Sequence, residues 1–532
     1  MRVVVAGGLV LTADHGSTAE LDLLVDDGVI VATGPWGSFA AADGSVQAEV
    51  IDASGCLVTP GFVNGHTHSH SGILKGIARE WTLEHSLTHG AWMASARSDE
   101  LTRLSALLTA TELLSSGCTA LFDLHSRTPT PTLEAIHLTA TAYATTGIRA
   151  TLAPMVSDRP LPASLPFLHQ GCGDPGIPSS PSQPVDSDQA GELGVGGPGV
   201  AGVLGQDPQP PTPQRPPEQP NTAHILETCT ALIESWPYDP TFLTPALAPT
   251  IPAHCTPTLT QGLATLARSH DLRLHTHLAE SKPQALAGEH YFGRSITAEL
   301  DRLGVLGPWL TAAHSIWTSP ADNELLGSAG VTAVTVPASN LRLGSGVQDS
   351  RGLLDAGVGL AIGTDGANSS DALDMVDGIR LTALLSRVSE RPAGEWLTVQ
   401  EVLRAATAGG AAALGRADDL GVIAPGFAAD LVLHDLSAVT YVPRTDVLNQ
   451  LVTAGRAVDV RTVLVAGRVV YDRGAWPGLD VPALRARATE LAAEYLERAA
   501  PARAESTTLL EASADSLAAA RRAPWHTRRL LP

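Results

Sequence analysis

The chain has 532 residues and a formal net charge of −21 at pH 7, with 55 acidic residues against 34 basic ones. Its basic residues form no cluster of the kind that neutralises phosphates, so we expect no nucleic-acid partner. Its five cysteines are widely spaced and include no C-x-x-C pair, which argues against a disulfide framework and favours a reducing cytoplasm.

The first residues, MRVVVAGGLVLTADHG, lack the layout of a signal peptide. Elsewhere in the sequence, no apolar run reaches the roughly 18 residues that a membrane helix needs. We therefore expect a soluble, cytoplasmic protein without a membrane partner.

Residues 1–58 contain short runs rich in β-branched residues, such as RVVVAGGLVLTA and LDLLVDDGVIVATG, separated by Gly and Asp. Short runs rich in β-branched residues occur again in residues 416–475, and residues 476–532 have the pattern of helices. Two β-rich ends around a long middle region predict one small β-sandwich domain built from both termini, followed by a C-terminal helical tail.

The middle region, residues 59–415, alternates helix-like and strand-like segments, for example TLTQGLATLARSH followed by LRLHTHL. Strict alternation implies a parallel sheet, and a (β/α)₈ TIM barrel needs about 250 residues. We therefore predict the α/β fold class, with a TIM barrel as the main domain. Residues 160–221 break the pattern with Pro, Gly, Ser and Gln, which indicates an insertion in a barrel loop and is typical of a solvated linker.

Four of the predicted strands end in side chains that can bind a metal. They are GFVNGHTH with His66 and His68, LRLHTH with His275 and His277, LTAAH with His314, and GLAIGTD with Asp365. Because the carboxyl ends of the strands meet on one face of a barrel, we expect these side chains to share a pocket. His66 and His68 point to the same side of their strand and could reach one ion, although such a pair alone is often only packed.

The motifs PGFVNGHTHSH, HTHLAE, AAHSIW, PASNLRLGSG and AIGTDG follow one another in this order. This run resembles the amidohydrolase superfamily, in the branch of the cytosine, guanine and adenosine-type deaminases and the triazine chlorohydrolases. The resemblance covers nearly the whole chain apart from residues 160–221. The sequence departs from the family at TVPASN, where relatives often have H-N-P-x-S-N.

The resemblance implies a site for one divalent metal ion. Its ligands would be His66, His68, His277 and Asp365, whereas His275 would be structural or lie behind the ligands. Dinuclear relatives bridge two ions with a carboxylated lysine after strand 4, and the corresponding stretch here, TFLTPALAPTIPAHC, contains no lysine. Such ligands suit Zn²⁺, our first choice, or Fe²⁺.

The resemblance also implies the catalytic groups. A bound divalent metal lowers the pKa of its water to about 7, and Asp365 would accept the proton of that water. Glu280 follows His277 in the family's H-x-x-E pattern and would protonate a ring nitrogen of the substrate, as a carboxyl with a raised pKa can. His314 would orient the hydroxide and stabilise the developing charge.

Loops after the strands are expected to contact the substrate. We nominate Trp81 and His70 after strand 1, His254 after strand 4, and Ser339 with Asn340 after strand 7. Structural alternatives stay open, since Trp81 could plug the barrel mouth, His254 could be a capped loop histidine, and a third ligand at His70 would crowd the ion.

We predict a hydrolytic deaminase that releases ammonia from a small amino-substituted heterocycle of the purine, pyrimidine, pterin, triazine or nucleoside type. By resemblance, Glu280 favours deamination, because some chlorohydrolases of this branch replace it. The alternatives are a hydrolytic dehalogenase, a ring-opening amidohydrolase of the imidazolone type, and an inactive scaffold, against which the complete ligand set argues. The resemblance to this family also suggests a homodimer or a larger homo-oligomer.

Overall fold

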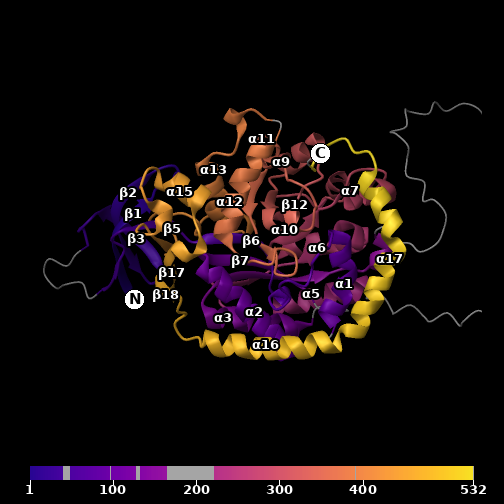
Figure 1. Ribbon diagram of the computed structural model, residues 1–532, viewed down its shortest axis with the longest axis horizontal. Coiled ribbons are helices and arrows are strands. Elements are labelled where there is room, and N and C mark those ends of the chain that lie inside the picture. The colour runs from indigo at the N-terminus through magenta and orange to yellow at the C-terminus, as the bar shows by residue number, and fades with distance from the viewer. Residues whose placement is uncertain (40–47, 96, 127–131, 165–220, 390, 531–532) are drawn as a thin grey trace, which may run out of the picture.

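The computed structural model describes residues 1–39, 48–95, 97–126, 132–164, 221–389 and 391–530. The insertion predicted at 160–221 lies outside the described residues except at its two ends. A sheet domain sits at one end of a central barrel, and two long C-terminal helices wrap the barrel's outer side (Figure 1). Among the described residues, no helix is both long and apolar enough to cross a membrane.

The barrel is built from parallel strands that occupy eight positions. In chain order these are β6 (Phe62–His68), β7 (Cys118–His125), β8 (Arg149–Val156), β9 (Leu243–Pro245) with β10 (Ala248–Pro249), β11 (Leu274–Leu278), β12 (Leu310–His314), β13 (Thr332–Thr335), and β14 (Gly359–Ile362) with β15 (Asp365–Gly366). A parallel bridge between Leu247 and Leu274 joins the two halves on one side, and Asp365 pairs with Thr67 on the other. The strands therefore close into a ring, and the predicted fold class is confirmed.

Every residue of β6, β7, β11 and β12 is buried, as expected for parallel strands that are covered on both faces. Helices form the outer layer. They are α1 (Leu83–Ser95), α2 (Asp99–Ser115), α3 (Leu133–Thr146), α4 (Leu161–Ser164), α5 (Thr222–Glu234), α6 (Pro257–Ser269), α7 (Lys282–Phe292), α8 (Ile296–Arg302), α9 (Pro320–Ser328), α10 (Pro337–Arg342), α11 (Ser350–Asp355), α12 (Met375–Leu385), α13 (Val399–Arg404) and α14 (Gly410–Ala413). Hydroxyl side chains start several of them: Ser281 accepts from the Gln284 amide and Thr256 from the Leu259 amide.

Both ends of the chain contribute strands to a single sheet. These strands are β1 (Arg2–Leu11), β2 (Thr18–Asp26), β3 (Val29–Pro35), β4 (Glu49–Asp52), β5 (Cys56–Pro60), β16 (Leu431–Asp435), β17 (Val460–Val465) and β18 (Arg468–Asp472). Antiparallel pairing of β16 with β5 joins the two ends. The edge strand β3 curls back to the segment that precedes β16. There the Ile30 amide donates to the Phe427 carbonyl, and Val29 forms an antiparallel bridge with Ala428. Apolar side chains such as Val5, Leu23 and Leu431 fill the space that the curled sheet encloses.

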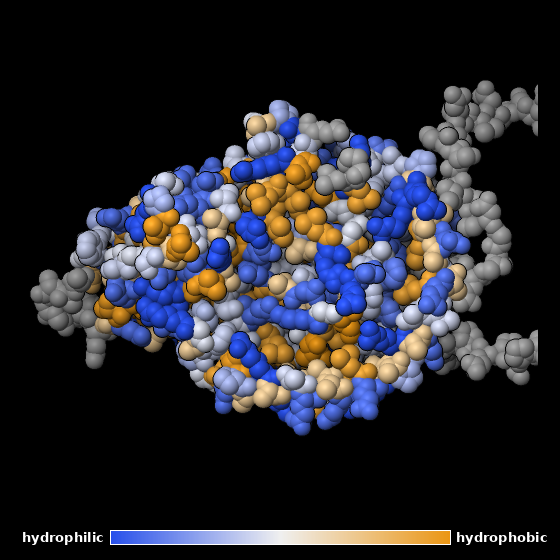
Figure 2. Space-filling model, in the orientation of Figure 1, coloured by the Kyte–Doolittle hydropathy of each residue, from blue (hydrophilic) through white to orange (hydrophobic). Residues whose placement is uncertain are grey.

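The described C-terminal region also contains three longer helices. After α15 (Val447–Ala454), the chain continues into α16 (Val481–Arg498) and α17 (Ala500–Arg522). One face of α16 is buried, through residues that recur every three or four positions: Val481, Leu484, Ala488, Leu491 and Tyr495. Its outer side, along the lower edge of Figure 2, carries hydrophilic residues interspersed with small apolar ones. The helix therefore packs on the barrel as an amphipathic surface element.

A buried ion pair connects the barrel to the sheet domain. Arg149, at the start of β8, donates to both carboxylate oxygens of Asp430 at 2.8 and 3.1 Å, and both side chains are about 5% exposed or less. Asp430 also accepts from the amide of Ala466, and its carbonyl accepts from the amide of Gly61, where the chain passes from β5 to β6. The same two residues thus join three segments that are far apart in the sequence.

We expect the Asp430→Ala variant to lose about 3–5 kcal/mol of stability, because it leaves the Arg149 guanidinium buried without its partner. A thermal melt followed by circular dichroism would show this as a lower midpoint. Arg487→Ala is the matched control: it breaks an ion pair to Glu100 whose side chains are 42% and 51% exposed, and such pairs contribute about 1 kcal/mol or less. Equal midpoints for the two variants would contradict this prediction.

Candidate metal centre and active site

The four predicted ligands converge at the carboxyl ends of the barrel strands. Asp365 Oδ1 lies 3.2 Å from His68 Nε2 and 3.5 Å from His66 Nε2, and His68 Nε2 lies 3.1 Å from His277 Nε2. Ligand atoms of His66, His68 and Asp365 all lie within 4.8 Å of one another, as do those of the set His66, His277 and His314. One ion could therefore bind ligands from β6, β11 and β15, with His314 at the end of β12 beside them.

Hydrogen bonds behind the histidines turn the same ring nitrogen toward the centre. Nδ1 of His68 bonds the Leu124 carbonyl at 2.8 Å, and Nδ1 of His277 bonds the Thr250 carbonyl at 2.6 Å. Because a carbonyl only accepts, each Nδ1 carries the proton, and each Nε2 offers its lone pair to a metal. Oriented imidazoles of this kind are the usual ligands of a divalent transition metal.

His66 is oriented by another histidine. Its Nδ1 lies 3.1 Å from Nε2 of His275, which is fully buried beside the ring of Phe122. Nε2 of His66 is buried and has no hydrogen-bond partner among the described residues. A buried nitrogen without such a partner that faces a carboxylate and two more imidazoles is suited to bind a cation, so these residues fit a metal ion.

The charge states also fit a cation. Burial lowers the pKa of His66 to about 3 and takes the pKa of His277 well below its usual range, so both imidazoles are neutral near pH 7. Burial alone would raise the pKa of Asp365, but the nearby imidazoles of His66 and His68 bring it well below its usual value. The centre therefore combines neutral nitrogen donors with an ionised carboxylate.

Glu280 and His314 lie next to the ligands and face each other. Glu280 Oε2 is 3.6 Å from His314 Nε2, and both side chains are almost fully buried. Burial and then the charges of Asp365 and Glu84 raise the pKa of Glu280 well above its usual value, which favours the protonated form of the carboxyl group. A protonated carboxyl in this position can donate a proton to a bound molecule.

The backbone at two of these residues is strained. His314 has a φ of 67° and Asp365 a φ of 61°, and Ser315, after His314, has a φ of 45°. Residues other than glycine pay about 1–3 kcal/mol each in the left-handed region and stay there only when their surroundings impose it. The surrounding contacts must therefore hold these residues in place.

Ser339 and Asn340, predicted to contact the substrate, lie on α10, and their side chains bond the protein itself. Ser339 Oγ donates to Asp365 Oδ2 at 2.5 Å, and Asn340 Oδ1 lies 2.9 Å from His314 Nδ1. The amide oxygen accepts, so Nδ1 of His314 holds the proton and its Nε2 faces Glu280 as an acceptor. These contacts favour a positioning role for both residues.

The other nominated residues lie around this centre. His70 is half-buried, its ring centroid is 5.3 Å from that of His68, and its Nδ1 accepts from the Ser126 amide. His254 ends the short helix η3 (Pro252–His254); it is 8% exposed, its Nε2 has no partner among the described residues, and burial lowers its pKa to about 4. Trp81 stacks on His89, with ring centroids 4.3 Å apart, and packs against the core. Their contacts with a substrate stay predictions.

Sequence reasoning missed one buried carboxylate, Asp123, near the end of β7. Asp123 accepts hydrogen bonds from the amide and hydroxyl of Ser69 and from the Tyr143 hydroxyl at 2.7 Å. Ser69 follows His68 directly, so Asp123 anchors the turn that carries two ligands. The available signal was its place near the end of the apolar run TALFD, as with the other strands.

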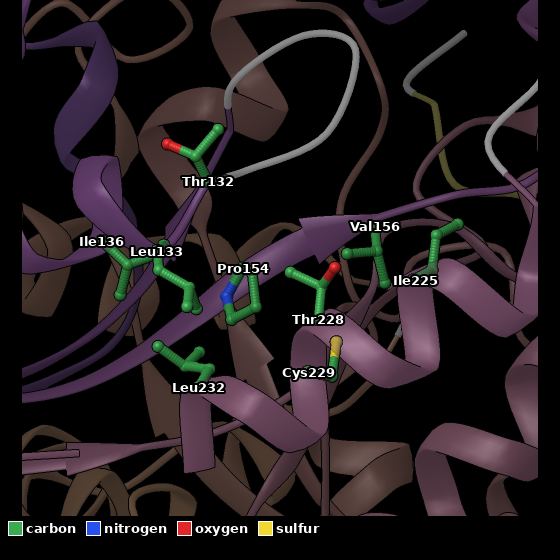
Figure 3. Close-up of a pocket in the computed structure, with 9 residues that line it drawn as sticks. All are labelled: Thr132, Leu133, Ile136, Pro154, Val156, Ile225, Thr228, Cys229 and Leu232. Carbon is green, nitrogen blue, oxygen red and sulfur yellow. The ribbon is translucent and has the colours of Figure 1, made fainter. Parts of the chain in front are cut away.

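Figure 3 shows a different cavity, between β8, α3 and α5. Its lining includes Ile136, Val156 and Leu232 and is largely apolar. Its one thiol, Cys229, has a pKa that burial raises to about 12, so it is unreactive near neutral pH. The cavity lies on the helical side of β8, opposite the barrel interior, and it does not carry the chemistry described above.

Comparison with known proteins gives one family. Residues 57–470 match the amidohydrolase family. A 5-methylthioadenosine/S-adenosylhomocysteine deaminase of Syntrophobacter fumaroxidans is 29% identical over 478 residues, covering 88% of this chain and 93% of the relative. A protein of the same name from Pyrococcus furiosus is 30% identical over 475 residues, covering 88% and 94%.

Solved structures agree with this relationship. A zinc-bound adenosine deaminase of Xanthomonas campestris superposes with a TM-score of 0.76 at 27% identity, covering 94% of this chain and 98% of that one. A zinc-bound atrazine chlorohydrolase of Arthrobacter aurescens superposes with a TM-score of 0.74 at 26% identity, covering 92% and 100%.

We expect the purified protein to hold about one metal ion per chain, since one tetrahedral centre uses four ligands. The His277→Ala variant should lose most of this metal, as measured by inductively coupled plasma mass spectrometry after gel filtration. His290→Ala removes an exposed histidine of the following helix and should keep the metal content. Equal metal content in both variants would remove His277 from the ligand set.

Proposed function

The chain belongs to the amidohydrolase family and is a hydrolase of non-peptide C–N bonds; from this premise we propose that it deaminates an adenosine-type nucleoside, with release of ammonia. The observation that carries the proposal is the buried Glu280 carboxyl group, whose pKa is raised, 3.6 Å from His314 and beside the His/Asp centre. The curated relatives named as 5-methylthioadenosine/S-adenosylhomocysteine deaminases support this substrate class. We propose 5′-thio-substituted adenosines as the first substrates to test.

We propose Zn²⁺ as the resident ion, held by His66, His68, His277 and Asp365, with Fe²⁺ as the alternative. Three imidazoles and a carboxylate suit both ions, and zinc-bound neighbours favour the first. When bound, the ion supplies Lewis-acid activation of a water molecule, whose pKa it lowers to about 7.

The protein's own groups move the protons. Asp365 is ionised and accepts a proton from the attacking water, whose oxygen forms a bond with the carbon that carries the amino group. Glu280 donates its proton to the neighbouring ring nitrogen, which makes that carbon electrophilic. His314 carries its proton on Nδ1, which Asn340 holds by a hydrogen bond. Its Nε2 can therefore accept a hydrogen bond from the attacking water. The amino group then takes the proton from Asp365, and the C–N bond breaks to release ammonia. The hydroxyl proton of the intermediate returns to Glu280, which leaves the carbonyl product and restores both carboxyl groups.

A second reaction is favoured by one observation, the similarity to the atrazine chlorohydrolase structure. Hydrolytic dehalogenation would use the same attack, with chloride as the leaving group in place of ammonia. The product separates the two reactions. Homo-oligomeric assembly and a cytoplasmic location stay predictions.

The test is ammonia release by metal-replete protein on a panel of adenosine, 5′-methylthioadenosine, S-adenosylhomocysteine, guanine, cytosine and a pterin, with chloride release from a chlorotriazine in parallel. Glu280→Gln should lower kcat/KM about 10²- to 10⁴-fold, the usual contribution of a general acid. Glu289→Gln, an exposed residue of α7, should leave it unchanged. Chloride without ammonia would select the alternative, and silence on every compound would reject both reactions.

Glu280 should hold its proton at pH 7 in the metal-free protein, because burial raises its pKa above the ordinary value of 4.5. A carboxyl with a raised pKa stays protonated below that pKa and ionises as the pH rises through it. The infrared difference spectrum between wild type and Glu280→Gln should therefore show the band of a protonated carboxylic acid at pH 7 and lose it at higher pH. A carboxylate band at pH 7 would contradict this charge state.

A further inference from the structure

The C-terminal segment ends against the active-site loops. α16 follows the lower side of the barrel, α17 rises along its edge, and the chain then reaches the region above β12 (Figure 1). Leu510, Leu517 and Ala520 of α17 pack against Ala287 of α7. Because α7 begins two residues after Glu280, this packing brings the tail to the loop that carries the proposed acid.

Arg529 connects two loops of the barrel mouth. Its Nε donates to the Ile316 carbonyl at 2.8 Å and its Nη2 to the Thr318 carbonyl at 3.1 Å, both in the loop after β12. Its Nη1 lies 3.5 Å from Asp349 Oδ2, and its own carbonyl accepts from the Val347 amide at 2.8 Å. The side chain is only 12% exposed, so these contacts form in a largely dry environment.

Glycine is required where the tail meets this second loop. Gly346 has a φ of 126°, and a Cβ built on it would lie 2.9 Å from the Arg529 carbonyl oxygen. A larger residue would push the tail away or strain the loop. The close approach shows that the segment is fitted to the loops.

The loop held by Arg529 begins at His314. Ile316 is two residues beyond His314, and His314 and Ser315 both occupy the strained left-handed region. On the other side, Gln348 Nε2 donates to the His314 carbonyl at 2.7 Å, and Gln348 lies between the residues that contact Arg529. Strain of about 1–3 kcal/mol per residue persists only under such external constraint. The tail therefore contacts both loops that hold His314, whose side chain lies 3.6 Å from Glu280.

A second arginine ties the same segment to neighbouring loops. Arg521 donates through Nη2 to the Gly344 carbonyl at 3.2 Å, and its own carbonyl accepts from Lys282 Nζ at 3.1 Å. Lys282 is two residues after Glu280, and Gly344 follows α10, which carries Ser339 and Asn340. The loops after three barrel strands are thus connected through one terminal segment.

We propose that residues 521–530 hold the loops after β11, β12 and β13 in place and that Arg529 is a positioning residue for His314. Arg529 contacts two carbonyls of the loop and none of the reacting groups, so it acts on the turnover step through the backbone of His314. Misplacement of a catalytic group by about 1 Å can cost up to about 100-fold in rate. This inference rests on the proposed function only for its kinetic measurement.

The test compares Arg529→Ala with Arg528→Ala in the full-length, metal-replete protein. Arg528 is the adjacent, exposed arginine and makes no hydrogen bond or ion pair among the described residues. Hydrogen exchange measured by mass spectrometry should be faster in the peptide covering residues 311–318 for Arg529→Ala only. With the best substrate of the panel, kcat should fall roughly 10- to 100-fold while KM stays within about twofold.

Arg529→Lys keeps the charge near Asp349 but lacks the planar fork that reaches two carbonyls, so it should restore kcat only in part. If Arg529→Ala does not fold, hydrogen exchange and kcat of Arg529→Lys test the proposal in its place. Exchange and kcat in Arg529→Ala that match Arg528→Ala would overturn the proposal, as would a loss expressed in KM alone. If the protein deaminates nothing on the panel, the exchange measurement still tests the positioning role independently of the proposed function.

Discussion

The structure depends on one electrostatic constraint: three imidazoles and one ionised carboxylate are held together away from water. Burial keeps the imidazoles of His66 and His277 neutral, and the nearby His66 and His68 keep Asp365 charged despite the same burial. A buried carboxylate with oriented lone pairs around it is costly unless a cation or hydrogen bonds compensate it. The barrel supplies this geometry because its strands end on one common face.

The groups that hydrogen-bond the predicted ligands and His314 are as important for the geometry of the centre as the ligands themselves. Carbonyls of Leu124 and Thr250 select the tautomers of two histidines, His275 supports a third, and Asn340 sets the proton of His314. Ser339 holds the second oxygen of Asp365. Each contact removes a rotation or a tautomer that would turn a lone pair away, so the centre is organised before any ligand arrives.

Parts of the chain outside the barrel stabilise the site from a distance. The Arg149–Asp430 pair fixes the sheet domain against the starts of β6 and β8, at the amino ends of the strands. The C-terminal segment acts at the opposite ends, where it joins loops that carry Glu280, His314 and Asn340. The two peripheral regions therefore hold the two faces of one barrel, and the strained backbone at His314 lies on the face that the tail covers.

The sequence by itself predicted the barrel, the sheet built from both termini, the helical tail and the residues of the metal centre. The signals for these features are local: alternating strand and helix patterns, the H-x-H spacing and the order of the motifs. They can be recognised along the chain without knowledge of the packing. Only the tertiary structure decided that His275 lies behind His66, that Asp123 anchors Ser69, and that Ser339 and Asn340 bond Asp365 and His314. It also decided that Arg529 reaches the loop after β12. These contacts join residues dozens or hundreds of positions apart, so no periodicity or spacing along the chain could encode them.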